Sequence, residues 1–187
     1  MEIQSTLGFG RVYFDSSSNA YRYRVNTKSD ILKLAILFNG KFATQNKIDQ
    51  LKAWINVLNA ESVKLIFNPD PFRPTLNDSW LSVFTTAEGS FFVKANNDGC
   101  FQLKQIIHVE LFEAFKLVFL TNRKINIDKS LFNQFSVSSK KDIQTIINFF
   151  SFSGLHPLTG LKSIQYFNWI NNLKNSNRYK NLKFPSL

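Results

Sequence analysis

Basic and aromatic side chains alternate along residues 21–25, the spacing in this chain that most directly indicates a chemistry. In a β-strand, neighbouring side chains point to opposite faces, so the Tyr and Val residues would share one face and the two Arg residues the other. Cations on such a face can meet phosphates. The chain has 23 Lys and Arg against 13 Asp and Glu, a net charge of +10. This excess favours a polyanion such as nucleic acid as partner; a merely basic soluble protein is the alternative.

Motifs for metal binding and nucleophilic catalysis are absent from the sequence. Cys100 is the single cysteine, so there is no disulfide framework and no thiolate cluster for zinc. His108 and His156 are far apart, and no carboxylate stands at metal-ligand spacing beside either. The chain has no Gly-rich phosphate loop and no nucleophile elbow. Ordinary hydrolases and nucleotide-binding enzymes have no support, and no stretch approaches the roughly 20 apolar residues of a membrane span.

An internal repeat organises the chain. Residues 23–31 resemble residues 135–143, because Val, Lys, Asp and Ile recur at one offset, 143 − 31 = 112. Further on, the Trp-Ile-Asn triplet at 54–56 matches the one at 169–171, at an offset of 169 − 54 = 115. Each copy has the pattern strand, helix, loop, helix.

Apolar residues at helical spacing predict two amphipathic helices in each copy. The strand at 21–25 ends at Asn26 and Thr27, polar residues suited to capping the next helix. The first helix of each copy would bury Ile31, Leu34, Ala35 and Phe38, or Ile143, Ile146, Ile147 and Phe150. The second helix would bury Ile48, Leu51, Ile55 and Leu58, or Leu161, Ile164, Phe167 and Ile170.

Between the copies, the Pro-rich stretch 68–74 indicates a linker. A short helix after Ser79 is expected to end at Gly89, which can adopt the left-handed cap conformation. A turn at Asn96–Gly99 predicts a hairpin of strands 89–95 and 100–105. The expected organisation is a first unit at 1–60 with strands and C-terminal helices only, a linker at 61–75, a second unit at 76–173 and a flexible basic tail at 174–187.

Residues 80–91 carry a resemblance to a known family. Their sequence, Trp-Leu-Ser-Val-Phe-Thr-Thr-Ala-Glu-Gly-Ser-Phe, resembles the motif of the LAGLIDADG homing endonucleases and intron maturases, commonly Trp-Leu-Ala-Gly-Phe-Ile-Asp-Ala-Glu-Gly-Ser-Phe. The flanks agree: residues 7–13 resemble the segment that leads into a family strand, residues 137–142 its strand-to-helix junction, and residues 154–162 the loop before its last helices. The similarity extends to about Leu173.

The resemblance implies an α/β (α+β) fold of two pseudo-symmetric lobes, each an antiparallel saddle-shaped sheet flanked by helices. Two motif helices pack side by side between the lobes, and the two sheets form a groove that grips nucleic acid. Each motif helix delivers one carboxylate, and the two carboxylates hold divalent metal, which activates water. By this resemblance Glu88 is the matching catalytic and metal-ligand position.

Three departures from the family pattern predict that cleavage has been lost. The repeat offset puts the first motif helix before Met1 (88 − 112 = −24), so the first lobe is expected to be truncated and Glu88 to be vestigial. Val83 stands where the family has Gly for close helix approach. Thr85 and Thr86 replace the apolar and acidic residues of the usual motif.

The binding surface is expected to remain. With the Tyr residues and Val25 facing the core, Arg22 and Arg24 would face the groove. The predicted nucleic-acid-binding residues of the sheets are Arg11, Tyr13, Arg22, Arg24, Lys94, Gln102, Lys104 and Gln105, of which Gln105 resembles a polar pocket residue of the family. The tail adds Lys174, Arg178, Lys180 and Lys183.

We therefore expect a catalytically inactive protein that binds RNA, without cofactor, in a mitochondrial ribonucleoprotein. The ribosome is the first candidate and an intron maturase the second, so the partners would be rRNA or intron RNA and neighbouring proteins, and no membrane. With 17 Lys against 6 Arg, and 20 Phe against 7 Gly and 5 Pro, the composition suits an AT-rich organellar genome. The alternative is a DNA endonuclease that uses Mg²⁺ and is completed by a second motif-bearing chain; a decaying reading frame without function is a third possibility.

Overall fold

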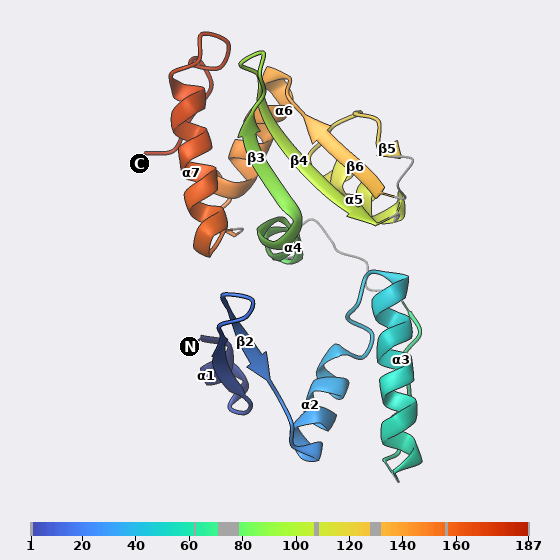
Figure 1. Cartoon of the computed structure of the whole chain (residues 1–187). Coiled ribbons are helices and arrows are strands. Elements are labelled where there is room, and N and C mark those ends of the chain that lie inside the picture. The colour runs from blue at the N-terminus through green and yellow to red at the C-terminus, as the bar shows by residue number, and fades with distance from the viewer. Residues whose placement is uncertain are drawn as a thin grey trace. The chain divides into compact units, whose positions relative to one another are not determined.

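The computed structural model describes residues 2–61, 63–70, 79–106, 109–127, 132–155 and 157–186. The chain separates into two compact units, Met1–Phe72 and Arg73–Leu187, and each is described by itself (Figure 1). Among the described residues, no helix is both long and apolar enough to cross a membrane. His108, His156 and residues 62 and 71–75 of the predicted linker lie outside the described residues.

The first unit consists of a hairpin and a helix pair. The two strands are antiparallel, and the two long helices pack around buried Ala35, Leu51, Ile55 and Leu58, as the apolar spacing predicts. Thr27 is the N-cap of the first long helix, and its side chain accepts a hydrogen bond from the Asp30 N–H, which confirms the predicted cap. The elements are α1 (Glu2–Leu7), β1 (Arg11–Asp15), β2 (Ala20–Arg24), α2 (Lys28–Phe38) and α3 (Gln45–Ala60).

The segment after α3 belongs to the first unit. Val63, Leu65 and Phe67 are partly buried against the helix pair. The Asn59 side chain accepts a hydrogen bond from the Leu65 N–H and donates one to the Leu65 carbonyl, each 2.9 Å long. The predicted linker at 61–75 therefore starts too early, because alternate apolar residues anchor its first part to the helices.

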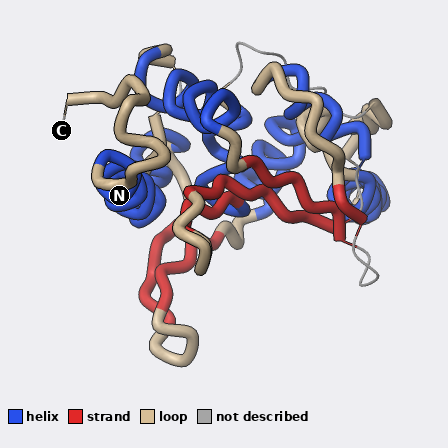
Figure 2. Tube along the Cα trace, turned by 90° about the horizontal axis from the view of Figure 1, so that it is seen from above, coloured by secondary structure: helices blue, strands red, loops and turns tan. Residues whose placement is uncertain are grey.

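The second unit contains a four-stranded antiparallel sheet in the order β3-β4-β6-β5. Its helices contact the strands, and Figure 2 shows helices gathered on one side of the sheet. The predicted hairpin is confirmed to within two residues at either end. The elements are α4 (Trp80–Glu88), β3 (Gly89–Val93), β4 (Gly99–Ile106), α5 (Val109–Val118), β5 (Asn126–Ile127), β6 (Phe132–Val137), α6 (Lys140–Ile147), the π-helical η1 (Asn148–Phe152) and α7 (Gly160–Lys174).

Aromatic rings form the core between this sheet and its helices. Phe91 and Phe101 on neighbouring strands have ring centres 5.0 Å apart, and Phe101 also meets Phe119 at 5.6 Å. The predicted apolar face of α6 is confirmed, because Ile143, Ile146 and Ile147 are fully buried, and Phe150 lies beside them in η1. The richness of the chain in Phe therefore stabilises one half of the molecule most.

The buried face of α7 differs from the predicted one. Leu161 and Ile164 are 86% and 58% exposed and Phe167 is 43% exposed, whereas Ile170 is buried as expected. The helix buries Tyr166, Trp169, Ile170 and Leu173 instead. Buried Trp and Tyr find partners for their polar atoms: Trp169 Nε1 donates to the Phe92 carbonyl at 3.1 Å, and the Tyr166 hydroxyl lies 2.7 Å from that of Ser151.

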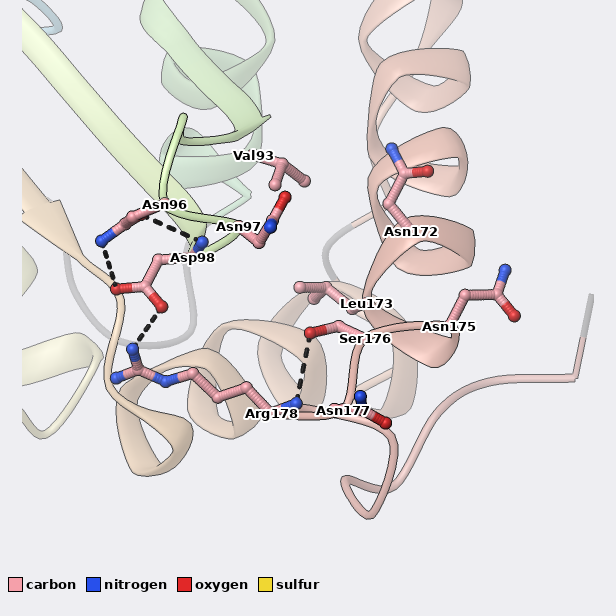
Figure 3. Close-up of a pocket in the computed structure, with 10 residues that line it drawn as sticks. All are labelled: Val93, Asn96, Asn97, Asp98, Asn172, Leu173, Asn175, Ser176, Asn177 and Arg178. Carbon is pink, nitrogen blue, oxygen red and sulfur yellow. Dashed lines mark hydrogen bonds and ion pairs between the residues drawn. The ribbon is translucent and has the colours of Figure 1, made fainter.

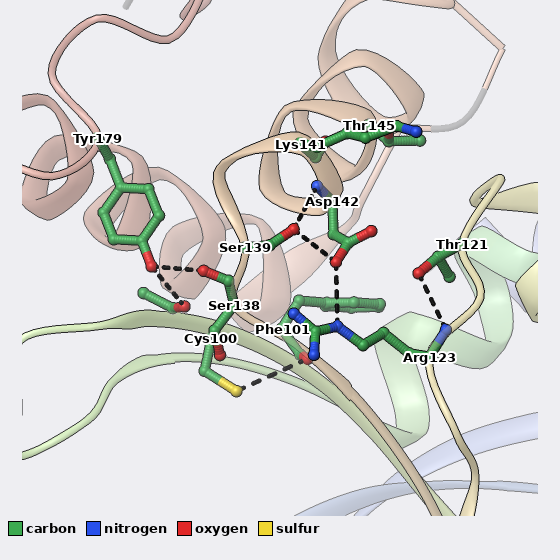
Figure 4. Close-up of polar contacts among 11 residues, drawn as sticks. Cys100, Phe101, Thr121, Arg123, Ser138, Ser139, Lys141, Asp142, Thr145 and Tyr179 are labelled. Carbon is green, nitrogen blue, oxygen red and sulfur yellow. Dashed lines mark hydrogen bonds and ion pairs between the residues drawn. The ribbon is translucent and has the colours of Figure 1, made fainter.

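The C-terminal segment is folded against the second unit, which corrects the expectation of a flexible tail. Tyr179 is 0% exposed, and its hydroxyl donates a 2.6 Å hydrogen bond to the Ser138 carbonyl (Figure 4). Leu182 and Phe184 are partly buried against the same core. Three apolar side chains at short spacing thus anchor a segment whose overall composition is basic.

Candidate nucleic-acid interface

Strand pairing in the first unit places Arg11, Tyr13, Arg22 and Arg24 on one face. Arg11 lies opposite Arg24 and Tyr13 opposite Arg22, and directly opposed residues of an antiparallel pair project from the same side. The Arg24 guanidinium carbon lies 4.9 Å from the centre of the Tyr13 ring, within cation–π range. Arg22 makes a 2.6 Å ion pair with Asp15, whereas no carboxylate among the described residues pairs with Arg11 or Arg24.

The alternation predicted that the opposite face of this hairpin packs on a core. This prediction is wrong. Tyr21 is 67% exposed and forms a ring pair with exposed Phe14, with ring centres 5.2 Å apart. Tyr23 is half-buried and donates a 2.6 Å hydrogen bond to the Phe9 carbonyl. The prediction assumed a sheet covered by helices, but the apolar core of the first unit lies between α2 and α3.

A hollow of about 640 Å³ adjoins the basic face of the hairpin. Arg11, Tyr13 and Arg24 line it together with Thr27 and Asp30 at the start of α2. Two guanidinium groups beside a tyrosine ring can hold a phosphate and stack on a base or sugar.

In the second unit, Gln102 and Lys104 project from the side of the sheet away from the helices. Their neighbours Phe101 and Leu103 are fully buried, so the intervening residues of β4 point the other way. Lys104 Nζ lies 4.8 Å from the centre of the Phe132 ring. Strand pairing adds polar residues that sequence reasoning missed, although the alternation of β6 contained the signal. We call the resulting set the outer face: Ser90, Gln102, Lys104, Asn126, Gln134 and Ser136.

Two predicted binding residues lie away from this outer face. Gln105 points to the other side of the sheet, opposite buried Asn133, and its side-chain oxygen accepts a 2.9 Å hydrogen bond from the Ile106 N–H. Lys94 is exposed in the β3–β4 turn, where its N–H donates to the Asp98 carbonyl. Gln105 therefore lies on the opposite side of the sheet from Gln102 and Lys104, because β4 stays extended and alternating to its end.

The four predicted cations of the C-terminal segment each contact a neighbour within the second unit. The folded backbone and these contacts therefore fix the directions of the four side chains, unlike the side chains of a flexible tail. The contacts are Lys174 Nζ to the Pro185 carbonyl (3.2 Å), Arg178 to the Asp98 carboxylate, Lys180 Nζ to the Asn177 side chain (3.3 Å), and Lys183 Nζ to the Phe152 ring (4.7 Å).

Helix α4 runs directly into strand β3, and Glu88 is the exposed last residue of the helix. Gly89 has an extended backbone (φ −77°) and is not the predicted left-handed cap. Glycine is required there for another reason: an added Cβ would lie 2.6 Å from the Thr85 carbonyl oxygen. Lys162 of α7 donates a hydrogen bond to the Gly89 carbonyl, which brings an ammonium group to the end of the motif helix.

Lys162 is a site residue that sequence reasoning missed. Burial lowers its pKa, and the nearby charge of Glu88 acts in the opposite direction. Its Nζ also donates to Gln165 at 3.0 Å, and at the 115-residue offset Lys47 donates to Gln50 over the same distance. The duplicated Lys-x-x-Gln pair was the available signal, because it begins the equivalent helices α7 and α3.

The described residues do not form a complete metal site. Glu88 supplies one carboxylate, and no group of three or more His, Cys, Asp or Glu side chains among these residues is arranged to hold an ion. Hard divalent cations bind several oxygen ligands. A divalent ion therefore does not fit the donor set of the described residues alone.

Helix α4 also departs from the family motif at positions other than Glu88. Val83 is 67% exposed, and the Thr86 hydroxyl donates a 2.8 Å hydrogen bond to the Ser82 carbonyl of its own helix. The buried hydroxyls of Ser82 and Thr85 have no hydrogen-bond partner within the described part of the chain. Unpaired buried hydroxyl groups lower stability.

Comparison with protein-family models gives no match. The Probable intron-encoded endonuclease 4 of Neurospora crassa is 33% identical over 177 residues; these are 90% of this chain, which spans only 32% of that relative. The LAGLIDADG meganuclease I-CpaMI bound to uncleaved DNA has a TM-score of 0.72 at 20% identity, with 91% of this chain and 74% of that chain covered. The meganuclease I-SmaMI bound to uncleaveable DNA has a TM-score of 0.73 at 18% identity, with 95% of this chain and 76% of that chain covered.

The chain has a LAGLIDADG homing endonuclease-like fold, and in sequence it is similar to an intron-encoded endonuclease. Its mixed fold of helices and antiparallel sheet is the predicted one, and the motif helix expected at 80–88 is α4. The basic hairpin face and the outer face are thus surfaces of a homing-endonuclease-like fold.

Proposed function

We propose that this LAGLIDADG-like protein binds RNA through the basic hairpin face of its first unit and the outer face of its second. The observation that carries the proposal is the composition of these faces. The hairpin face combines arginines with a tyrosine ring, and the outer face combines one lysine with carboxamides, at alternating strand positions; no apolar core of the described residues covers either face. Cations hold phosphates, whereas rings and amides contact bases and sugars.

We further propose that the RNA belongs to a mitochondrial ribonucleoprotein, with the ribosome as first candidate and an intron-containing RNA as second. The amino-acid composition, which suits an AT-rich genome, supports an organellar gene. The Neurospora crassa relative is named an intron-encoded endonuclease, which supports the same origin. Identification of the RNA that copurifies with the native protein separates rRNA from intron RNA, and an exclusively nuclear or cytosolic RNA would contradict this part.

The loss of cleavage is part of the same proposal. Glu88 supplies one carboxylate, whereas the family chemistry uses two to hold metal. Val83 and Thr86 replace motif residues that support close helix packing and acidity. The 187-residue polypeptide alone is expected to leave DNA intact in Mg²⁺ or Mn²⁺. Site-specific cutting that Glu88→Gln abolishes would overturn this expectation.

A DNA endonuclease completed by a second motif-bearing chain is the second candidate. The position of Lys162 favours this candidate. Its ammonium group lies at the end of the motif helix, where the charge of Glu88 acts on its pKa. The two candidates differ in the effect of Glu88→Gln. The variant should leave RNA binding unchanged or slightly tighter, but it should abolish cleavage in any active two-chain assembly.

A salt titration of RNA affinity tests the binding surface. The triple variant Arg22→Gln, Arg24→Gln, Lys104→Gln should weaken binding and flatten its salt dependence. Each lost phosphate contact lowers the log–log slope by about 0.7 for single strands and about 0.9 for duplex DNA. The matched control, Lys52→Gln, Lys64→Gln, Lys141→Gln, removes the same charge from exposed positions elsewhere. Equal slopes for the two triple variants would place the binding surface elsewhere.

A further inference from the structure

A cavity of about 650 Å³ lies between the β3–β4 turn and the C-terminal end of α7 (Figure 3). Its volume is within the range of small-molecule sites. It is distinct from the outer face, because turn and helix-end residues form it. The lining residues are Val93, Asn96, Asn97, Asp98, Asn172, Leu173, Asn175, Ser176, Asn177 and Arg178.

The lining is polar but close to neutral. Arg178 pairs with Asp98, whose carboxylate also accepts a hydrogen bond from the Asn96 side chain at 3.2 Å. The carboxamides of Asn97 and Asn172, in contrast, make no hydrogen bond to another described residue. Each free carboxamide offers two N–H donors and one carbonyl acceptor. The cavity therefore presents donors and acceptors side by side, without a net charge to attract a small ion.

The remaining walls suit a flat ligand that carries N–H donors. Val93 provides apolar surface, whereas Leu173 is buried behind it and packs against Gly99, where an added Cβ would lie 2.3 Å from its methyl carbon. Helix α7 ends here, and the carbonyl groups at a helix C-terminus carry partial negative charge that favours donor groups. The Arg178 guanidinium, whose central carbon lies 5.4 Å from the centre of the Tyr179 ring, adds a planar group beside these walls.

We propose that this cavity binds one unpaired nucleobase of a single strand. The inference rests on the proposed nucleic-acid-binding function and names the ligand that this second site recognises. A nucleobase is neutral and flat, and its edge alternates donors with acceptors that complement carboxamides. A base within a duplex has its pairing edge occupied, so the site selects single strands. Exposed Lys94 and Lys180 lie beside the lining segments, where they can meet the phosphates of the same strand.

The alternative occupant is a lysine-rich peptide, and the lining argues against it. Such a peptide needs free carboxylates, whereas Asp98, the acidic residue of the lining, is already engaged by Arg178. The neutral carboxamides dominate the remaining polar surface.

The test is fluorescence anisotropy of the full chain with labelled eight-nucleotide homopolymers of A, C, U and G. The same sequences as single-stranded DNA and a duplex RNA of equal length complete the set. Asn97→Gly removes one carboxamide but tolerates the left-handed backbone of this turn (φ +62°), and Asn172→Ala removes the other. Asn168→Ala is the matched control, because it is an exposed Asn on the same helix outside the cavity.

Each cavity variant should weaken binding of the preferred single strand about three- to tenfold, the effect of one lost hydrogen bond. Duplex affinity and the salt slope should stay at the parent values, and Asn168→Ala should match the parent throughout. Tighter binding of RNA than of DNA would show that the ribose is recognised as well. Equal affinities would assign recognition to the base alone, and both results support the site.

The cavity variants separate base binding in the cavity from nucleic-acid binding by the chain as a whole. If single strands bind with the parent's affinity to both cavity variants, the cavity is not a base site, although nucleic-acid binding stands. If no nucleic acid binds any variant, the proposed function fails together with this site. Binding of a lysine-rich peptide that competes with the single strand, and that the cavity variants lose, would also overturn the assignment.

Discussion

Asp30 in the first unit and Asp142 in the second stand at equivalent places of the 112-residue repeat, each at the start of a helix. The helix begins after Thr27 in one case and Ser139 in the other, and the hydroxyl of each accepts a hydrogen bond from the Asp N–H. Each carboxylate accepts a 2.6 Å hydrogen bond from the same hydroxyl. The repeated sequence therefore builds the same reciprocal cap twice.

The surroundings of the two carboxylates differ. Asp30 pairs with Lys33 of its own helix. Asp142 is buried and pairs with Arg123, which comes from the segment between α5 and β5 (Figure 4). Burial acts to raise the pKa of Asp142, but hydrogen bonds from Ser139, Thr121 and Arg123 outweigh it, so the pKa lies below its usual value. A local cap in one unit has become a connection between elements in the other.

This difference follows from the sheets behind the helices. The first unit has a two-stranded hairpin and a small core between α2 and α3, whereas the second has four strands and a large aromatic core. An isolated hairpin is marginally stable in water. Equivalent sequence thus gives equivalent helices, but the contribution of a residue to stability depends on what lies across from it. We expect matched substitutions to cost more in the second unit.

The largest effect is expected at the C-terminal segment. Tyr179→Ala should lower the free energy of unfolding by about 3–5 kcal/mol, as is typical when a fully buried aromatic side chain is removed. At the 115-residue offset the equivalent position is exposed Lys64. Lys64→Ala should change the free energy of unfolding by less than about 0.5 kcal/mol. Tyr179→Phe should cost about 1 kcal/mol, because it removes the hydrogen bonds but keeps the ring. Urea unfolding measures all three; equal costs for Tyr179→Ala and Lys64→Ala would show that the segment is not docked in solution.

The two capping carboxylates provide the next comparison. Asp142→Asn should cost about 1–2 kcal/mol, because it weakens a helix cap and leaves the Arg123 charge unpaired. Asp30→Asn should have a smaller effect, since its ion-pair partner Lys33 is exposed and lies on the same helix. Urea unfolding of each variant beside the parent provides the measurement. A larger cost at Asp30 would mean that the local cap, and not the tertiary contact, sets the contribution of these residues.

The pH dependence of Asp142 sharpens this result. A carboxyl group whose pKa is lowered by folding stabilises the protein above its unfolded pKa of about 3.9, and the contribution disappears as pH falls through the folded pKa. The stability difference between the parent and Asp142→Asn should therefore be full at pH 7 and shrink below about pH 4. Unfolding curves at pH 7, 5, 4 and 3 measure it, and a difference that grows on acidification would contradict the assigned direction.

Sequence reasoning succeeded where local pattern determines structure. The repeat located both helix pairs, and the motif located α4 and the following hairpin. Alternation correctly placed Arg11, Tyr13, Arg22 and Arg24 on one face, because the pairing of β1 with β2 keeps alternate residues on the same side. It failed for Tyr21, since periodicity shows which residues share a face but not whether a core covers that face.

The remaining errors have physical causes of the same kind. Leu161 and Ile164 are more apolar than Tyr166 and Trp169, but the larger rings bury more surface and find hydrogen-bond partners. The basic composition of the C-terminal segment concealed Tyr179, whose burial depends on backbone carbonyls distant in sequence. Of the site, the strand faces were accessible to prediction, but the position of Lys162 beside Gly89 depends on how α7 packs against β3.

The smallest expected effect concerns the duplicated Lys-x-x-Gln pairs. Lys47 and Lys162 make the same 3.0 Å contact with a Gln on their own helix, so the local interaction is matched. Lys162 alone of the two also donates to the carbonyl of Gly89, at the junction of the motif helix with β3. Replacement by Met removes the ammonium group but keeps a chain of similar length.

Lys162→Met should therefore lower the free energy of unfolding by about 1 kcal/mol, because it leaves the Gly89 carbonyl without this donor. Lys47→Met should change it by less than about 0.5 kcal/mol, as expected for an exposed helix position. The two variants have the same net charge, so a general electrostatic effect would shift both equally. Equal costs in urea unfolding would show that the bond to Gly89 contributes nothing. A loss of stability confined to Lys162→Met would show where the two units differ, although their sequences are alike at this point. Helix α7 meets the junction of α4 with β3, and α3 has no such contact through Lys47.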